Sequence, residues 1–557
     1  MLLTGSTAAT SKLEVAMAPS STLALSALPT RAPNDAEPPA RFALVLRPEQ
    51  SAREVAAAVQ TELAEFDPQI APISPADHGV LVLELPTRTL HHTEPARAYA
   101  AGYALAEDFG LRTAEPDLPT PFFPEEEVPQ PGEAVPEEIR FPPGCWVDAE
   151  NLPPRWALDR LNVPAAWEFS IAEGRPARGA GIVIAQPDTG VVAHTELDGV
   201  VRFGGWDVLD RDPDPTDPLD GRNPGHGTGT ASVVVSPEAR TVAGSAPAAS
   251  HMPIRAVTSV IQVTQVSVAE AIGHAVDNGA HVITMSLGGV PADVLERAVR
   301  RAVAADVIVL AAAGNCVRTV VWPARYEECI AVAGTNNADG MWRGTCRGSA
   351  VDIAAPAQNV LKAVASNGTE VGQGQGTSFA VALTAGVAAL WLAHHGRADL
   401  IAAARARGET LQDMFRRLLR ATARRPAGWN GFEMGAGIAD ARSLLAADLD
   451  AGRDRETVLP PDPFEEPGFS VASLVAETVS PEAADDPELD WVRFGPELAT
   501  ALLERQLLTR GDEGATTETT VAVEVSGDLA GAVRNHHLRD HLQLDDDLDA
   551  EVGEAGP

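Results

Sequence analysis

Short apolar runs alternate with stretches of helical pattern across the middle of the chain, between about residues 156 and 449. The apolar runs show no polar alternation, which is typical of strands buried on both faces, and they lie at 181–185, 250–256, 281–286, 307–313 and 330–334. Helical patterns stand between them, at 268–278 and 292–304. Buried strands that alternate with helices predict an α/β fold with a parallel sheet. Such a sheet carries its site at the carboxyl ends of the strands.

A smaller pattern of strands and helices precedes this sheet. Apolar runs predict strands at 42–46, 79–85 and 111–116, and helical patterns stand at 52–63 and 96–109. We expect these elements to form a small α+β domain over residues 41–120.

The remaining segments have biased compositions. Residues 1–40 are rich in Ala, Ser, Thr and Pro and are predicted to be a disordered leader. Residues 121–150 are crowded with Pro and Glu, which is typical of a linker. Residues 450–557 are acidic and are predicted to be a largely irregular extension, with one helix at 497–508. The central domain is therefore expected to span 151–449.

Charge and hydropathy exclude two classes of partner. The 557 residues include 78 Asp and Glu against 42 Lys and Arg, for a formal net charge of -36. Nucleic acid and anionic membranes repel such a polyanion, so neither is expected as a partner. No uninterrupted apolar run approaches the ~20 residues of a membrane span. The first residues lack a basic region followed by a long apolar block, so we expect no ordinary signal peptide and a cytoplasmic location.

The four cysteines, at 145, 316, 329 and 346, leave two interpretations open. They form no Cys-x-x-Cys pair, which argues against a zinc site. Cys316 and Cys329 are close enough in sequence for a disulfide. They could equally be unpaired small residues of the core.

Three segments carry candidate chemistry. Asp188 ends an apolar strand and precedes a turn glycine, His226 stands among glycines at the start of an apolar helix, and Ser378 begins another apolar helix. Taken singly, each has an ordinary structural explanation: a turn aspartate, a loop histidine and a helix cap. Taken together in this chain order, they predict an Asp-His-Ser triad for acyl transfer.

Two further strand ends support that chemistry. Asn315 follows a buried strand and Gly314, where its side-chain amide could donate to an oxyanion. Two stretches of bare backbone could pair with an extended peptide, and we take as substrate-binding residues Ser286, Leu287, Gly288, Ala312, Ala313 and Gly314.

These motifs make a family resemblance recognisable. Residues from about 156 to 442 resemble the subtilase family, and most closely its thermitase branch. The matching stretches are WALDRLNVPAAW at 156–167, PDTGV at 187–191, GHGT at 225–228, SLGG at 286–289, AAAGN at 311–315, IAVAGT at 330–335, GTSFA at 376–380 and GAGIADA at 435–441. The resemblance implies a three-layer α/β/α subtilisin-like catalytic domain and serine endopeptidase activity. It also implies that Asp188, His226 and Ser378 are the triad, with Asn315 as the oxyanion donor.

The chain departs from the family pattern near each triad residue without removing a catalytic atom. These departures put substrate range and local packing in doubt. They stand at Gln186, Pro187, Gly229, Phe379, Ala382 and Leu383.

An acidic loop between the Asp and His motifs is a candidate metal site. Asp207, Asp210 and Asp212 are closely spaced carboxylates, and calcium takes 6–8 oxygen ligands from such loops. The loop resembles one that binds calcium in thermitase-like enzymes, so structural calcium is expected there. A solvated acidic loop without an ion is the alternative. No cofactor is expected for catalysis.

The domain at 41–120 also resembles a subtilase prosegment, and residues 111–117 resemble the segment that closes such domains. A prosegment would template folding and inhibit the enzyme by occupying its cleft. The alternative is an unrelated accessory domain.

The sequence therefore predicts a serine endopeptidase that acts on a peptide or protein. Two other functions stay open: a protease dedicated to maturing one peptide, and a binding protein without catalysis on the same scaffold.

Overall fold

A seven-stranded parallel sheet forms the centre of the protein. The computed structural model describes residues 20–32, 37–118, 145, 147–221, 223–260, 263–453, 469–510 and 523–544. Within these residues the strand order is β11-β10-β9-β8-β5-β7-β6, and every pair is parallel. The strands are β5 (Val183–Asp188), β6 (Trp206–Asp207), β7 (Ser250–Arg255), β8 (Val282–Met285), β9 (Ile308–Ala312), β10 (Ile330–Thr335) and β11 (Ile353–Pro356).

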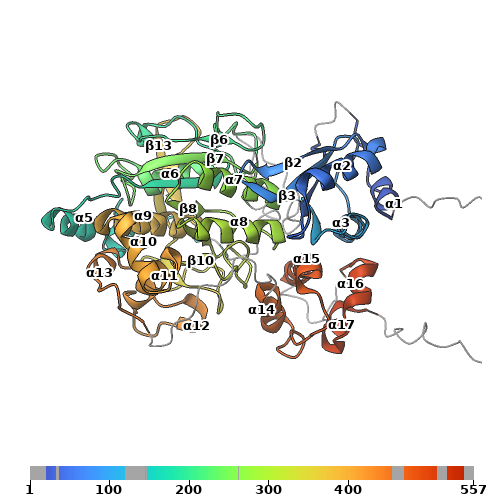
Figure 1. Cartoon of the computed structure of the whole chain (residues 1–557). Coiled ribbons are helices and arrows are strands. Elements are labelled where there is room, and N and C mark those ends of the chain that lie inside the picture. Colours follow the sequence, from blue (N-terminus) through green and yellow to red (C-terminus); the bar gives the residue numbers. More distant parts are fainter. Residues whose placement is uncertain are drawn as a thin grey trace, which may run out of the picture.

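Successive side chains along the strands enter two different cores, one on each face of the sheet. Ile184 and Val282 pack with helices α6 and α9, whereas Ala185 and Ile283 pack with α7 and α8. This alternation follows from the two-residue period of a strand. It makes the central unit, residues 147–453, a three-layer α/β/α fold, as predicted (Figure 1).

The helices of the central unit cover both faces and the ends of the sheet. They are α4 (Trp156–Arg160), α5 (Val163–Ala172), α6 (His226–Val235), α7 (Gln265–Asp277), α8 (Asp293–Ala304), α9 (Thr377–His395), α10 (Arg397–Ala406), α11 (Leu411–Ala421), α12 (Gly431–Met434) and α13 (Ala441–Leu445). A short 3-10 helix, η3 (Thr195–Leu197), and an antiparallel hairpin of β12 (Val360–Val364) and β13 (Glu370–Gly374) complete the unit. By length and composition α9 could cross a membrane, but its whole apolar window is buried inside the protein.

The N-terminal unit, residues 20–118, is an antiparallel sheet with helices. Its strand order is β2-β3-β1-β4. Its elements are α1 (Ser20–Ser26), β1 (Ala40–Val45), α2 (Ala52–Glu62), η1 (Ala64–Phe66), β2 (Gln69–Ser74), β3 (Asp77–Leu85), α3 (Pro95–Asp108) and β4 (Thr113–Pro116).

Helix α1 corrects part of the expected disordered leader. Ser20 and Ser21 bind the Asp108 carboxylate of α3, and Leu25 is fully buried. These contacts give residues 20–26 a partner that composition does not reveal. Residues 1–19 and 33–36 of that leader, and residues 121–144 and 146 of the expected linker, lie outside the described residues.

The C-terminal unit, residues 469–544, differs from the largely irregular extension that we expected. Its described residues contain α14 (Phe469–Thr478), α15 (Trp491–Arg510), α16 (Gly527–Ala532) and α17 (His536–Leu542). Leu474, Leu498, Leu502, Leu529 and Leu538 are buried in one core, although acidic residues surround them in sequence. The acidic composition of this segment led to the expectation of an irregular chain, because it outweighs the short apolar faces of the helices. Figure 1 shows this unit beside the N-terminal unit, with α15 facing α3.

Candidate active site

Asp188 and His226 meet at the carboxyl edge of the central sheet. Asp188 is the last residue of β5, and His226 is the first residue of α6. The His226 Nδ1 atom donates to Asp188 Oδ1 at 2.8 Å. The carboxylate is only 1% exposed, so it must be satisfied by hydrogen bonds. Thr189 N donates to Oδ1 at 2.8 Å and Thr230 Oγ1 lies 3.2 Å from Oδ2, which completes its environment.

Gln186 supports this pair from beneath. Its Nε2 donates to Gly227 O at 2.9 Å and to Thr230 Oγ1 at 2.7 Å, both on α6. Its Oε1 accepts from His251 Nε2 at 2.8 Å. Burial, and secondarily the charge of Arg202, lower the pKa of His251 to about 3, so this histidine is neutral. In the sequence Gln186 is only a departure from the family pattern, but in the structure its hydrogen bonds join β5 to the start of α6.

Ser378 lies at the start of α9, which packs against α6. Among the described residues, the hydrogen-bond acceptor of its hydroxyl is Ser286 O, at 3.3 Å. The Ser286 hydroxyl donates in return to Ser378 O at 3.0 Å. His226 is thus the first residue of α6 and Ser378 the second residue of α9, but the Ser378 hydroxyl points to Ser286 and not to His226. Hydrogen bonds between catalytic groups are often formed only when substrate is bound.

Asn315 lies across Gly376 from Ser378. Its Oδ1 accepts from both the backbone N–H and the hydroxyl of Thr377, each at 2.9 Å, and this leaves Nδ2 as the outward donor. Gly376 has a φ of 149°, which favours glycine. An added Cβ there would lie 3.4 Å from Asn315 Nδ2 and 3.7 Å from Ser378 N. Two donors thus converge on the space above a residue with no side chain.

The predicted substrate-binding residues lie at the carboxyl ends of β8 and β9, and Ser286 contacts Ser378. Ser286, Leu287 and Gly288 follow β8, whereas Ala312 is the last residue of β9 and Ala313 and Gly314 follow it.

Val321 closes the space between these two segments. Its N–H donates to Ala313 O at 3.1 Å, and the next residue, Trp322, donates to Gly289 O and accepts from Gly289 N. An added Cβ on Gly288 or Gly314 would lie 2.5 or 2.9 Å from Val321 Cγ2. The sequence contains no signal for the role of Val321, because that role depends on the return of the chain to the sheet edge.

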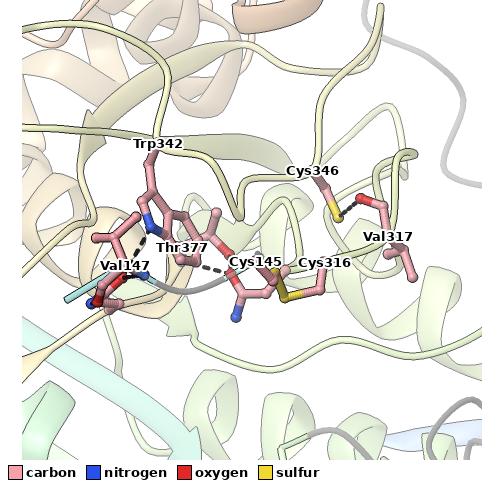
Figure 2. Close-up of a disulfide and its surroundings, with 9 residues drawn as sticks. Cys145, Val147, Cys316, Val317, Trp342, Cys346 and Thr377 are labelled. Atoms are coloured by element: carbon pink, nitrogen blue, oxygen red, sulfur yellow. Dashed lines mark hydrogen bonds between the residues drawn. A yellow bond between two sulfur atoms is a disulfide. The ribbon is translucent and has the colours of Figure 1, made fainter. Parts of the chain in front are cut away.

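A disulfide joins the end of the linker to the loop that follows Asn315 (Figure 2). Cys316 pairs with Cys145, with 5.7 Å between their Cα atoms, so the pairing of Cys316 with Cys329 that we considered is wrong. Cys329 is instead a buried residue outside any disulfide. Val147 extends the attachment, because it exchanges two hydrogen bonds with the Gln375 side chain. This side chain also accepts from Trp342 Nε1, so the linker end is fixed beside Asn315.

The expected calcium ligands do not fit a shared ion. Arg255 Nη1 donates to Asp207 Oδ2 and Asp210 Oδ2, each at 2.6 Å. The other Asp207 oxygen accepts from Leu209 N and Asp210 N, and Asp212 Oδ1 accepts from a backbone N–H. The guanidinium of Arg255 therefore stands where a cation would balance these carboxylates. This arrangement also differs from the alternative of a freely solvated loop.

The departures near Ser378 are accommodated by packing. Phe379, Ala382 and Leu383 are all buried along α9, and the Phe379 ring lies against the backbone of Gly374. None of the three intrudes between Asn315 and Ser378.

Comparisons with known proteins agree with this geometry. Residues 179–437 match the model of the Subtilase family. Thermitase of Thermoactinomyces vulgaris is 37% identical over 248 residues, covering 44% of this chain and 83% of that protein. Subtilisin Savinase of Lederbergia lenta is 31% identical over 245 residues, covering 43% of this chain and 84% of that protein. The solved protease domain of PatA is 27% identical with a TM-score of 0.41, covering 49% of this chain and 96% of that one.

The Arg255 arrangement predicts stability that is independent of calcium. Changing Arg255 to Leu would leave Asp207, whose side chain is 3% exposed, as an unpaired buried charge. We expect this change to lower the free energy of unfolding by about 3–5 kcal/mol. Asp210→Ala should cost far less, because that side chain is 67% exposed. Chemical denaturation measures both changes in the free energy of unfolding. The proteins also carry Ser378→Ala, because this change prevents self-digestion. A melting temperature that rises with calcium and falls with a chelator would contradict this interpretation.

Proposed function

Because the chain belongs to the subtilase family and is a subtilisin-like serine protease, we propose that it cleaves internal peptide bonds with Asp188, His226 and Ser378 as its triad. The hydrogen bond of 2.8 Å between His226 and the buried Asp188 carries the proposal. It holds the imidazole with its Nδ1 protonated and its Nε2 available as a base.

In the proposed mechanism, the Ser378 hydroxyl turns from Ser286 O towards His226. His226 Nε2 takes the hydroxyl proton while Ser378 Oγ attacks the peptide carbonyl. Asn315 Nδ2 and Ser378 N donate to the oxyanion. His226 then returns the proton to the leaving amine, and an acyl-enzyme forms on Ser378. Water, deprotonated by His226, hydrolyses this ester and restores Ser378. The buried Asp188 stabilises the imidazolium at each step.

We also propose that the N-terminal unit is an inhibitory prosegment. Glu115 accepts from Asp293 N at 2.7 Å and Val294 N at 3.1 Å, which are the first N–H groups of α8. Asp117 accepts from Val266 N at the start of α7 at 2.9 Å. Side-chain oxygens at helix N-termini accept from N–H groups that have no partner within the helix. These contacts support docking of the unit where its last strand, β4, leads towards the linker. A docked accessory domain remains the alternative.

The other functional hypotheses differ in what supports them. The converging donors around Gly376 favour catalysis over a binding role alone, because they serve no evident purpose in a binding scaffold. Broad proteolysis and maturation of one dedicated peptide both remain compatible with the site. A cytoplasmic location stays a prediction. The Cys145–Cys316 disulfide counts against it, because disulfides persist mainly in oxidising compartments.

The triad predicts two different losses of activity. Ser378→Ala should lower kcat by several orders of magnitude and abolish labelling by a fluorophosphonate probe. Asn315→Ala should lower kcat by about 10²–10³ with little change in KM, because the oxyanion exists only beyond the ground state. Peptide hydrolysis and probe labelling measure both, with circular dichroism as the control for folding. Near-normal turnover by the Ser378→Ala protein would refute the assignment.

Val321 predicts a preference for small residues before the scissile bond. Its Cγ2 methyl lies between Gly288 and Gly314 in the segments at 286–289 and 312–315, and the first of these segments contacts Ser378 through Ser286. With Val321, peptides that carry Ala before the cleaved bond should be hydrolysed at least tenfold faster than those that carry Phe, by kcat/KM. Val321→Gly should lower this ratio of kcat/KM values strongly, because it opens the space to Phe. Val321→Ala should give an intermediate ratio. A ratio that does not depend on residue 321 would exclude this role.

Docking of the N-terminal unit should weaken as the pH rises. Burial and the nearby Asp293 carboxylate raise the pKa of Glu115 to about 8, against attraction by Arg112. A raised carboxyl pKa means that the docked state retains a proton which the released state gives up. Docking is therefore strongest below about pH 4.5 and is lost as the pH rises through 8.

We expect roughly tenfold faster dissociation of the separated N-terminal fragment at pH 8 than at pH 6. The measurement uses Ser378→Ala protein whose linker has been cut. Glu115→Gln, which cannot ionise, should reduce this dependence. The same pH dependence with and without Glu115 would assign the effect to other groups.

A further inference from the structure

The C-terminal unit contacts both of the other units. On one side, α14 lies against the segment that follows Val321. Trp322 Nε1 donates to Ser470 Oγ at 3.2 Å, and Arg325 Nη2 donates to Glu477 at 2.8 Å. Arg325 is buried and its Nε also donates to Ser470 O, so this attachment to the central unit is specific in its geometry.

On the other side, α15 lies against α3 of the N-terminal unit (Figure 1). Tyr103 OH donates to Glu497 Oε2 at 2.8 Å, and Tyr99 OH lies 3.2 Å from Thr500 Oγ1. All four of these residues are buried. The Tyr103 ring also meets the Phe494 ring edge to face, at 5.1 Å between their centroids. A buried aromatic pair and two hydrogen bonds therefore join the N-terminal and C-terminal units in a packed interface.

Glu497 is the centre of the interface. Besides the Tyr103 hydroxyl, it accepts from the backbone N–H of Ser526 and from its hydroxyl, which caps α16. One carboxylate thus joins α15, α16 and α3. Tyr103 and the Ser526 hydroxyl share Oε2, and the Ser526 N–H is the donor to Oε1, so moving either helix away removes a donor from a buried carboxylate.

We propose that the C-terminal unit is an intramolecular clamp, whose partner surface is α3 and which keeps the N-terminal unit docked on the central unit after the linker is cut. This proposal rests on the proposed function only in taking that cut as a step of activation. The N-terminal unit is held at two surfaces: its carboxylates bind the starts of α7 and α8, and α3 binds α15. Because both surfaces belong to one folded chain, each raises the effective concentration for the other. Cutting the linker alone therefore leaves the fragment bound, and its release requires the α3–α15 contact to open.

The test uses full-length protein with Ser378→Ala, which cannot process itself. A glutamate-specific endopeptidase cuts the linker, which contains Glu125, Glu126 and Glu127. Size-exclusion chromatography and a dissociation time course then measure how fast the N-terminal fragment leaves. We expect the fragment of the parent protein to co-elute with the rest of the chain.

Glu497→Ala should speed dissociation at least tenfold. Its matched control is Glu488→Ala, the same change at an exposed site of the same unit, which should leave the rate unchanged. Tyr103→Phe removes the same hydrogen bond from the other side while it keeps the ring packed on Phe494. If Glu497→Ala prevents the C-terminal unit from folding, the dissociation rate of the Tyr103→Phe protein tests the clamp instead. A dissociation rate in the Tyr103→Phe protein equal to that of the parent overturns the clamp.

Peptide hydrolysis by the chain that retains Ser378 separates this proposal from the proposed function. Faster release in the variants, together with activity that rises on release, supports both the clamp and the inhibitory prosegment. Faster release with unchanged activity supports the clamp and refutes the inhibitory role. The absence of hydrolysis before and after release refutes the proposed function, while the dissociation rates still test the clamp.

Discussion

The buried carboxylate of Asp188 is the constraint on which the site depends. A charge that is 1% exposed at the end of a strand must be compensated by donors, and here they come from Thr189, which follows β5, and from His226 and Thr230 of α6. The hydrogen bonds that the Asp188 carboxylate needs therefore hold the start of α6 at the sheet edge. Gly227, where a Cβ would collide with Gly190 O, allows this close approach. His226 is oriented by the same contacts that make the carboxylate tolerable.

Gln186 shows how far this requirement extends. It stands two residues before Asp188, so its side chain leaves the same face of β5 and reaches α6. Its carbonyl oxygen needs a donor in turn, and the neighbouring strand supplies His251. Burial keeps that histidine neutral, so no extra charge is placed near Asp188. A polar residue in an otherwise apolar strand is acceptable because all its hydrogen-bonding groups are used.

The sheet and the motif residues could be predicted because both follow from local rules. Buried parallel strands are continuous apolar runs, and their carboxyl ends share one edge of the sheet, where Asp188 ends β5 and Asn315 follows β9. The partners across the fold could not be predicted. Arg255 lies 2.6 Å from Asp207 because β6 and β7 pair in a register that places these residues side by side. Cys145 reaches Cys316 only because the linker end returns to the site. Neither fact is encoded in spacing along the chain.

The C-terminal unit was misjudged because its burial depends on the other units. The helix expected at 497–508 is present within α15 (Trp491–Arg510), but the burial of its Leu498 and Leu502 was not expected, because the acidic composition of the segment favours solvation. Once α3 and α14 cover these residues, the acidic Glu497 becomes a buried acceptor. Burial raises its pKa to about 7, even though Ser526 and Tyr103 donate to it. Glu115, with a pKa raised to about 8, lies at the other surface that holds the N-terminal unit. Release of the N-terminal unit therefore breaks contacts of both carboxylates, because Tyr103 of that unit donates to Glu497 and Glu115 of that unit accepts from the start of α8.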